Sequence, residues 1–255
     1  MNKALLALCL AVAVTSSREA RAHQDDAPGD HTHGTIPFDY TRNRSPQYGA
    51  IELRFGPYRP NIDSEFAGAT PYEDSFGAKP SFSIGIEGSW QVLRIPYFGT
   101  LGPGIGLHWF RKNGIAEFTS GDPGSGHKNS LWILPMYGVG VLRIDVLARE
   151  WKIPLVPYVK GGLAFALWES RDAGSLSVDD DGTRARGSEI GPQIQGGIMV
   201  LLDPLQPQWA IDMDNSTGVN HAYLFAEWWM SDVNSFGSGM QVGTRTWVAG
   251  LALEF

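Results

Sequence analysis

Apolar and polar residues alternate with a period of two along most of the chain after residue 46. The clearest example is the segment 81–92, where Phe82, Ile84 and Ile86 share one face and Glu87 lies on the other. An amphipathic helix would instead repeat its apolar residues three and four positions apart. The alternation therefore predicts β-strands rather than helices.

The strand pattern recurs along the chain in segments of similar length. Each segment is long enough to cross a bilayer as a tilted strand, for which roughly 9–11 residues suffice. The eight segments are residues 47–57, 80–92, 98–110, 130–146, 154–169, 187–203, 220–230 and 243–255.

The connections between these segments alternate in length. Residues 93–97 and 147–153 form short turns, and in the connection 204–219 a short helix is expected near Gln208–Met213. The other connections are long and rich in Gly, Ser, Asp and Pro: residues 58–79, 111–129, 170–186 and 231–242. Long loops on one side and short turns on the other are typical of an outer-membrane barrel.

Together these features predict an all-β fold, an eight-stranded antiparallel transmembrane β-barrel with up-and-down meander order, over residues 47–255. A soluble β-sandwich is the alternative, because its strands also alternate between an apolar and a polar face. The length of the segments, and the charges and glycines on the less apolar face, favour the barrel. With an even number of strands, both termini are expected on the periplasmic side.

The first residues have the features of a secretory signal peptide, which is excluded from the fold. Lys3 supplies a positive start, residues 4–14 form an apolar core, and residues 20–22 read Ala-Arg-Ala, a small-x-small cleavage site. We therefore expect a signal peptide at 1–22, with the only cysteine, Cys9, inside it. Residues 23–46 are polar and aperiodic and are expected to form a flexible periplasmic leader.

Composition and charge narrow the class further. The chain has 255 residues, of which 18% are charged and 11% aromatic, which argues against intrinsic disorder. Its net charge of −7 argues against a nucleic-acid partner, since nucleic acids select basic surfaces. After residue 22 no stretch approaches the roughly 18 consecutive apolar residues of a membrane-spanning helix.

Strand parity assigns charged side chains to the interior of the barrel. On the fourth segment both faces are apolar enough to face lipid, but Arg143 and Asp145 there would be costly in the bilayer, so they are assigned inward. We expect these charges to pair as a structural salt-bridge plug; a narrow or gated polar path is the alternative. The predicted interior network is Glu52, Arg54, Glu87, Arg143, Asp145, Lys160 and Glu227.

The last segment ends on an aromatic residue, with apolar residues at alternate positions before it. It resembles the β-signal of bacterial outer-membrane proteins, which the barrel-assembly machinery reads. The residues that carry this resemblance are Trp247, Leu251, Leu253 and Phe255. The resemblance implies the assembly machinery as a partner during biogenesis.

Several short stretches resemble a narrower family, the small eight-stranded outer-membrane barrels of myxobacteria and their relatives. These stretches are residues 52–58 with 60–63, 142–145, 157–160 and 218–221. That family is defined by fold and location, so the resemblance implies an outer-membrane position and no catalytic activity.

Catalytic and metal-binding patterns are weak. His108 has no serine within four residues, and the Asn220-His221 pair is interpreted as a capping or turn pair. His23, His31 and His33 are metal-friendly, but they fall in the leader, where geometry would be poorly defined. No catalytic residue, metal site or cofactor is therefore expected.

The leading interpretation is a monomeric, non-enzymatic protein of the Gram-negative outer membrane that supports the envelope or presents binding loops. The alternatives are a narrow channel or carrier for small or hydrophobic solutes and, third, an enzyme that modifies lipid A. Outer-membrane lipids are the expected partners. Arg245, about ten residues before the C-terminus, is expected at the outer surface, in contact with lipopolysaccharide phosphates.

Overall fold

The computed structural model describes residues 48–115, 128–172, 175–177, 185–205 and 207–255. The predicted signal peptide, the leader with its three histidines, and the boundary at residue 47 lie outside the described residues. Those assignments remain predictions.

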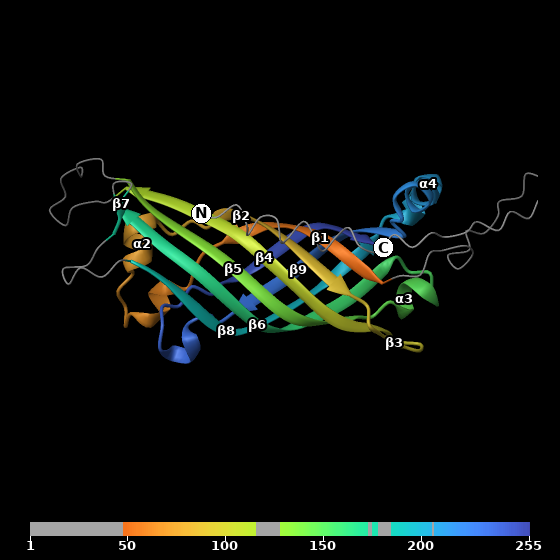
Figure 1. The fold of residues 1–255 in the computed structure, drawn as a ribbon, viewed down its shortest axis with the longest axis horizontal. Coiled ribbons are helices and arrows are strands. Elements are labelled where there is room, and N and C mark those ends of the chain that lie inside the picture. The colour runs from red at the N-terminus through yellow and green to blue at the C-terminus, as the bar shows by residue number, and fades with distance from the viewer. Residues whose placement is uncertain (1–47, 116–127, 173–174, 178–184, 206) are drawn as a thin grey trace, which may run out of the picture. The chain divides into compact units, whose positions relative to one another are not determined.

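Eight long strands form one closed antiparallel ring (Figure 1). Each strand pairs with its neighbours in sequence, the last pairs with the first, and the pairing of β2 with β4 completes the circle. The predicted eight-stranded up-and-down barrel is therefore confirmed. The strands are β1 (Gly49–Tyr58), β2 (Ser81–Trp90), β4 (Gly99–Ile115), β5 (Lys128–Arg143), β6 (Leu155–Asp172), β8 (Arg186–Leu201), β9 (His221–Ser231) and β10 (Arg245–Glu254).

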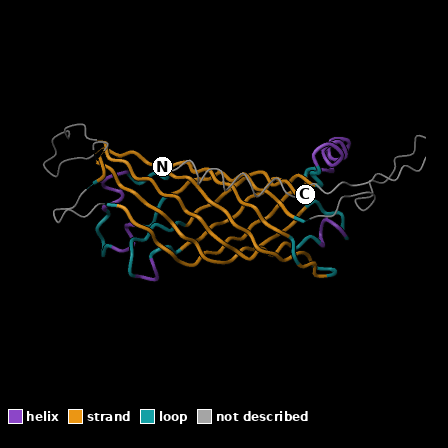
Figure 2. Tube along the Cα trace, viewed as in Figure 1, coloured by secondary structure: helices purple, strands orange, loops and turns teal. Residues whose placement is uncertain are grey.

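Shorter elements gather at the two ends of the barrel, as Figure 2 shows. We call the end where β1 begins and β10 finishes the terminal end; it carries β3 (Leu93–Ile95), α3 (Val146–Arg149), η2 (Asp203–Leu205) and α4 (Pro207–Thr217). The opposite, loop end carries η1 (Ile62–Glu65), α2 (Pro71–Phe76), β7 (Ser175–Leu176) and η3 (Ser235–Gly237). None of the helices in the described part of the chain is long and apolar enough to cross a membrane.

The helix expected near Gln208–Met213 is present as α4, and it extends further in both directions. Pro207 occupies its first position, where the missing N–H costs no hydrogen bond. It ends before Gly218, whose φ of 72° suits the residue that follows a helix. These two residues set its bounds.

Burial alternates along the strands with the period that the sequence shows. In β9, for example, Tyr223, Phe225 and Trp229 are buried, whereas Leu224 and Trp228 face outward. The fourth predicted segment follows the assignment made from its charges: residues 131, 133, 137, 139 and 141 are buried inside, and 132, 134 and 136 are more exposed on the exterior. The barrel thus has one apolar outer wall and one mixed, enclosed interior.

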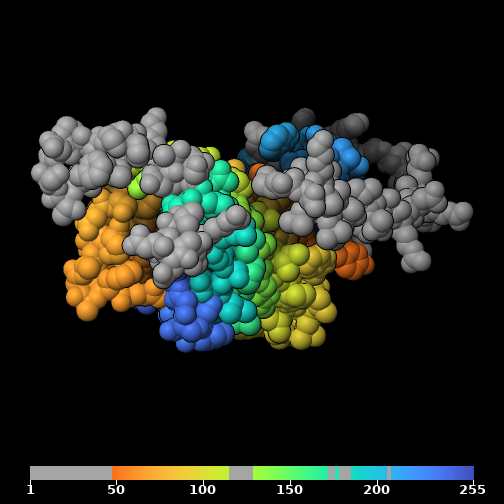
Figure 3. All heavy atoms as spheres, turned by 60° about the vertical axis from the view of Figure 1, so that its left-hand side comes forward, coloured from red at the N-terminus to blue at the C-terminus, as the bar shows by residue number. Residues whose placement is uncertain are grey.

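Two connections meet over the mouth at the loop end. Figure 3 turns this end forward and shows residues 59–80 in orange and 232–244 in blue. Asn61 N–H donates to the carbonyl of Gly243 at 2.8 Å, and the Tyr58 hydroxyl donates to the carbonyl of Val242 at 2.5 Å. Tyr72 on α2 is 2% exposed, so this short helix packs its tyrosine into the protein rather than presenting it to solvent.

Closure of the ring predicts resistance to mild detergent denaturation. Deleting residues 245–255 removes β10 and leaves β1 and β9 with unpaired edges, which cannot hold a closed barrel. After refolding in detergent, the full chain is expected to migrate faster on gels when unheated than when boiled, and the truncated chain to migrate identically in both cases. A fast unheated band from the truncated chain would show that β10 is not needed for closure.

Candidate functional site

A cluster of charges occupies the middle of the barrel interior. Its members project inward from β1, β2, β6 and β9, at the parity opposite to the apolar outer residues. The side chains of all five are completely shielded from solvent: Glu52, Arg54, Glu87, Lys160 and Glu227.

Arg54 is the hub of this cluster. Its Nη1 donates to Glu52 Oε2 at 2.6 Å and to Glu87 Oε2 at 2.9 Å, and its Nη2 donates to Glu227 Oε1. Its Nε donates to His108 Nε2 at 3.1 Å. Its Nη2 also donates to Gln195 Oε1 at 3.5 Å. One guanidinium group thus links five interior side chains from five strands, which uses the fixed fork of donors that arginine offers.

Lys160 binds the same three carboxylates from the opposite wall. Its Nζ lies 2.7 Å from Glu52 Oε2, 2.6 Å from Glu87 Oε1 and 3.7 Å from Glu227 Oε2. Each of the three carboxylates therefore faces at least two cations. Buried charges require such pairing, because isolated they would lose most of their hydration energy.

Two phenols complete the coordination of the carboxylates. Tyr137 donates its hydroxyl hydrogen to Glu87 at 2.7 Å, and Tyr158 donates to Glu227 at 2.8 Å. The interior network predicted from the sequence includes neither tyrosine. Their inward parity is visible in the sequence, but their partners on other strands are not.

A second layer of charges lies toward the terminal end. Arg143 donates to Ser89 at 3.0 Å and lies 3.4 Å from Glu52 and 3.8 Å from Glu254. Tyr223 donates its hydroxyl hydrogen to Glu254 at 2.8 Å. Glu254 was missed by the sequence analysis, although its alternation with outward Leu253 could have placed it inside.

An aromatic layer fills the interior on the loop-end side of the cluster. The His108 ring lies 4.7 Å from the Trp229 ring, and Tyr58 lies 4.7 Å from Phe110. The glycine at position 85 makes room for the histidine, because a Cβ there would come within 2.7 Å of its ring. Phe110 is 0% and Trp229 is 1% exposed, so this layer leaves little room for water.

The loop end is closed by polar contacts as well as by α2. Lys112 donates to the backbone carbonyls of Gly77 and Lys79, and Arg59 lies 3.1 Å from Asp63 and 2.8 Å from Glu73. Tyr72 is buried beneath them, and this burial raises the pKa of its phenol above the ordinary value. These contacts hold the connection after β1 over the mouth.

Asp145 is a correction to the predicted interior network. The inward assignment assumed that the strand continues through residue 145, but β5 ends at Arg143 and the chain turns into α3. Asp145 precedes this helix at the terminal end, where its carboxylate lies 2.9 Å from Arg94 and 3.9 Å from Arg149. Parity arguments fail where a strand ends.

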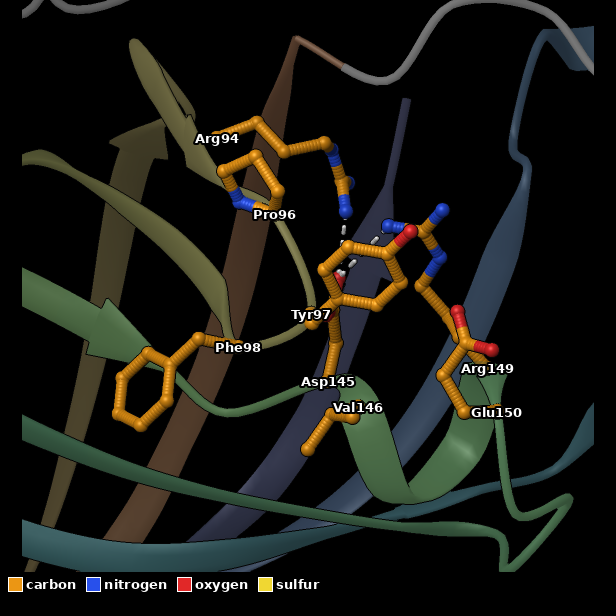
Figure 4. A pocket seen from close by; sticks show the side chains of 8 residues that line it. All are labelled: Arg94, Pro96, Tyr97, Phe98, Asp145, Val146, Arg149 and Glu150. Carbon is orange, nitrogen blue, oxygen red and sulfur yellow. Dashed lines mark hydrogen bonds and ion pairs between the residues drawn. The ribbon is translucent and has the colours of Figure 1, made fainter.

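Asp145 belongs to a pocket of about 330 Å³ at the terminal end (Figure 4). The tip of the β3–β4 hairpin forms one side of this pocket, and α3 forms the other. Its lining residues are Arg94, Pro96, Tyr97, Phe98, Asp145, Val146, Arg149 and Glu150.

The residues of the predicted assembly signal lie on β10 and just beyond it. Trp247 is exposed on the outer wall, and Leu251 and Leu253 face the same way. Phe255 follows the strand; its N–H donates to Gly49 O at 2.9 Å and its carbonyl accepts from Tyr48 N–H at 2.7 Å. These contacts place the chain end against β1.

Arg245 begins β10 at the loop end, is exposed and pairs in register with Met230. Other outward arginines lie at this end. Arg111, Trp132, Glu169 and Arg186 are register neighbours across β4, β5, β6 and β8. Arg171 donates to Glu169 at 2.5 Å, and the rings of Trp109 and Trp132 lie 5.3 Å apart. Among the described residues, Arg111, Arg171, Arg186 and Arg245 thus face outward here, beside Glu169.

A histidine–carboxylate pair lies at the terminal end. His221 Nδ1 bonds to Asp203, and the backbone N–H of Ala222 donates to Asp203 at 3.3 Å. Asp203 therefore joins η2 to the start of β9, which accords with a turn role for this histidine. In the described part of the chain no three His, Cys, Asp or Glu residues group to hold a metal ion.

No family model and no curated protein matches the chain. Solved structures of small outer-membrane barrels are similar to it in fold. OprG of Pseudomonas aeruginosa has a TM-score of 0.46 and 12% identity over 83% of this chain and 97% of that one. Ail of Yersinia pestis, solved with a heparin analogue, has a TM-score of 0.42 and 10% identity over 82% of this chain and 97% of that one. Neisserial surface protein A has a TM-score of 0.39 and 12% identity over 82% of this chain and 97% of that one.

Fold and interior together define a class: closed eight-stranded barrels with an apolar outer wall and an ion-paired interior. At 10–12% identity, the likeness to the solved barrels concerns the fold alone.

Replacing the hub of the cluster should destabilise the barrel strongly. Arg54→Leu leaves three buried carboxylates facing Lys160, and we expect the free energy of unfolding to fall by about 3–5 kcal/mol. Urea unfolding of the purified protein in detergent, followed by tryptophan fluorescence, measures this change. Arg245→Leu removes the same charge from an exposed position and should leave the midpoint unchanged. Equal midpoints for both variants would contradict a structural role for the cluster.

Proposed function

We propose that this chain is a non-enzymatic integral protein of a bacterial outer membrane, with a closed interior and with loops presented to the outside. The observation that carries the proposal is the distribution of polarity: paired charges inside a closed ring, and large apolar side chains on its outer wall. A soluble protein has the reverse arrangement.

The outer wall supports membrane insertion. Large apolar residues from most of its strands lie exposed on it, and a contiguous exposed apolar surface marks a site of membrane or protein contact. Members of this surface from six strands, with exposures of 43–59%, are Leu53, Ile86, Ile105, Leu163, Ile194 and Leu224. The closed ring also excludes the β-sandwich alternative, since the polar face is enclosed rather than open to water.

The lengths of the connections at the two ends support an orientation in the membrane. A strand barrel satisfies all its backbone groups, which is required in hydrocarbon, and bacterial barrels carry their longer loops outside the cell. The loop end is therefore taken as external and the terminal end as periplasmic. The predicted signal peptide and the resemblance of residues 247–255 to the β-signal agree with export and with assembly by the barrel machinery. Without an open sheet edge, a monomer is expected.

The finer family assignment rests on the sequence resemblance. Residues 52–58, 142–145 and 157–160, which resemble the myxobacterial type of barrel, include Glu52, Arg54, Arg143 and Lys160 of the interior cluster. The resemblance therefore involves residues with a structural role in this barrel, and we retain that family as part of the proposal.

The interior favours a structural role over a channel. Arg54, Lys160 and Phe110 are 0% exposed, and the charges bind one another rather than lining a water path. Eight strands enclose just enough space for side chains to fill. A narrow or gated path remains the second candidate, since a polar cluster would be its lining.

Reconstitution tests this choice. In planar bilayers the protein is expected to insert, to show protease-protected strands and to give no stable open conductance, because breaking the cluster would unpair several buried charges at once. A steady single-channel conductance from the intact protein would instead support the second candidate. A chain that stays water-soluble without detergent would overturn membrane insertion itself.

Outward arginines at the loop end suit the phosphates of lipopolysaccharide. Guanidinium groups bind phosphate through two parallel hydrogen bonds, and Arg245, Arg111 and Arg186 point out from the wall at the level where headgroups would begin. Arg111 and Arg186 flank Trp132 and Glu169, so two guanidinium groups and one carboxylate lie in this row of described residues.

Neutralising these arginines should weaken lipid retention without affecting the fold. For Arg245→Ala, and separately for the pair Arg111→Ala and Arg186→Ala, we expect about three- to fivefold less co-purified lipopolysaccharide, about 1 kcal/mol in each case. Arg59→Ala, in a loop whose arginine is bound to Asp63 and Glu73, is the control. If the amount of co-purified lipopolysaccharide is unchanged while heat-modifiable migration is intact, these arginines are solvated charges at the rim and do not bind lipid.

A further inference from the structure

The pocket at the terminal end of the barrel is lined by charged side chains of both signs. Arg94 comes from β3, whereas Asp145, Arg149 and Glu150 come from the short segment around α3. Figure 4 shows the two guanidinium groups approaching Asp145 from different elements, with dashed lines to its carboxylate. Two cations and two carboxylates thus share one pocket of about 330 Å³.

The arginines are placed to bind a further anionic group. Arg149 is 49% and Arg94 is 40% exposed, whereas the carboxylate between them is 20% exposed. The ion pair of Arg149 with Asp145 spans 3.9 Å, longer than a hydrogen bond, so the strongest hydrogen bonds of this guanidinium are available to a ligand. A phosphate oxygen is a suitable acceptor for such a planar fork of donors.

An aromatic ring from a residue with a strained backbone lies at the mouth of the pocket. Tyr97 has a φ of 58°, a left-handed conformation that costs energy for a residue with a side chain. Its side chain is 86% exposed. Tyrosine in this position presents an apolar ring and a polar hydroxyl, as side chains do at the boundary between lipid and water.

We infer that this pocket binds the headgroup of a zwitterionic phospholipid, with phosphate on Arg149 and Arg94 and the primary ammonium on Glu150. Among the described residues that line the pocket, two positive and two negative charges balance, which matches a headgroup that carries one negative and one positive charge. The inference rests on the proposed function, because it requires the terminal end to lie at the surface of a phospholipid leaflet.

The outer wall below the pocket offers a path for acyl chains. Leu101, Leu142 and Val159 are register neighbours across β4, β5 and β6, and Leu142 lies three residues before Asp145. Next along the wall, Gly140 faces Gly161. A Cβ added at Gly161 would meet nothing within 4 Å, so the wall is open there beside the leucine side chains.

Lipid retention by the purified full chain tests the inference. In native mass spectrometry from detergent, the protein is titrated with phosphatidylethanolamine or with phosphatidylglycerol of the same acyl chains. The intact protein is expected to retain more phosphatidylethanolamine. Arg149→Gln should lower retention of both lipids about fivefold, and Glu150→Gln should remove the preference between them. Lys152→Gln, on the same connection but outside the pocket lining, is the control and should change neither.

The outcomes separate the lipid from other sources and from the proposed function. Soluble glycerophosphoethanolamine at the same concentration as the lipid should not displace bound phosphatidylethanolamine. Displacement by the soluble compound as effective as by the lipid would mean that the site binds a free headgroup, and would overturn the lipid assignment. Retention of phosphatidylethanolamine by Arg149→Gln at the level of the intact protein, compared at equal amounts of the heat-modifiable band, would also overturn it. In either case an inserted, heat-modifiable barrel leaves the proposed function standing.

Discussion

The ion cluster around Arg54 and Lys160 is the constraint on which the barrel depends. Three carboxylates and two cations lie where water does not reach, so each charge needs a partner on another strand. Those partners come from β1, β2, β6 and β9, on opposite walls of the ring. The cluster therefore ties distant strands together and disfavours any register shift, since a slip of one residue would turn the charges into lipid.

The rest of the interior is arranged around this cluster in layers. Toward the terminal end, Arg143 extends the network to Glu254, and toward the loop end His108 joins it to the aromatic layer of Trp229 and Tyr58. Small residues at inward positions create the space that the large ones need. The result is a barrel whose interior is occupied by paired charges and packed aromatic rings.

The two rims differ in the chemistry they offer to lipid. In the described part of the chain, Arg111, Arg186 and Arg245 face outward near the loop end, and the terminal end carries a pocket lined by two arginines and two carboxylates. Such a difference matches a membrane whose leaflets have different headgroups.

Much of this structure follows from the sequence alone, because alternation with a period of two specifies both the strand and its faces. It predicted the eight strands, α4 and the inward parity of Glu52, Arg54 and Lys160. Pairing is different: Arg54 and Glu227 are 173 positions apart, and only the closed ring brings them together. Likewise, only the folded chain decided that β5 ends before Asp145, that Gly85 accommodates His108, and that α3 and the β3–β4 hairpin enclose a pocket. Local periodicity carries no information about which strand lies across the barrel or where a turn begins.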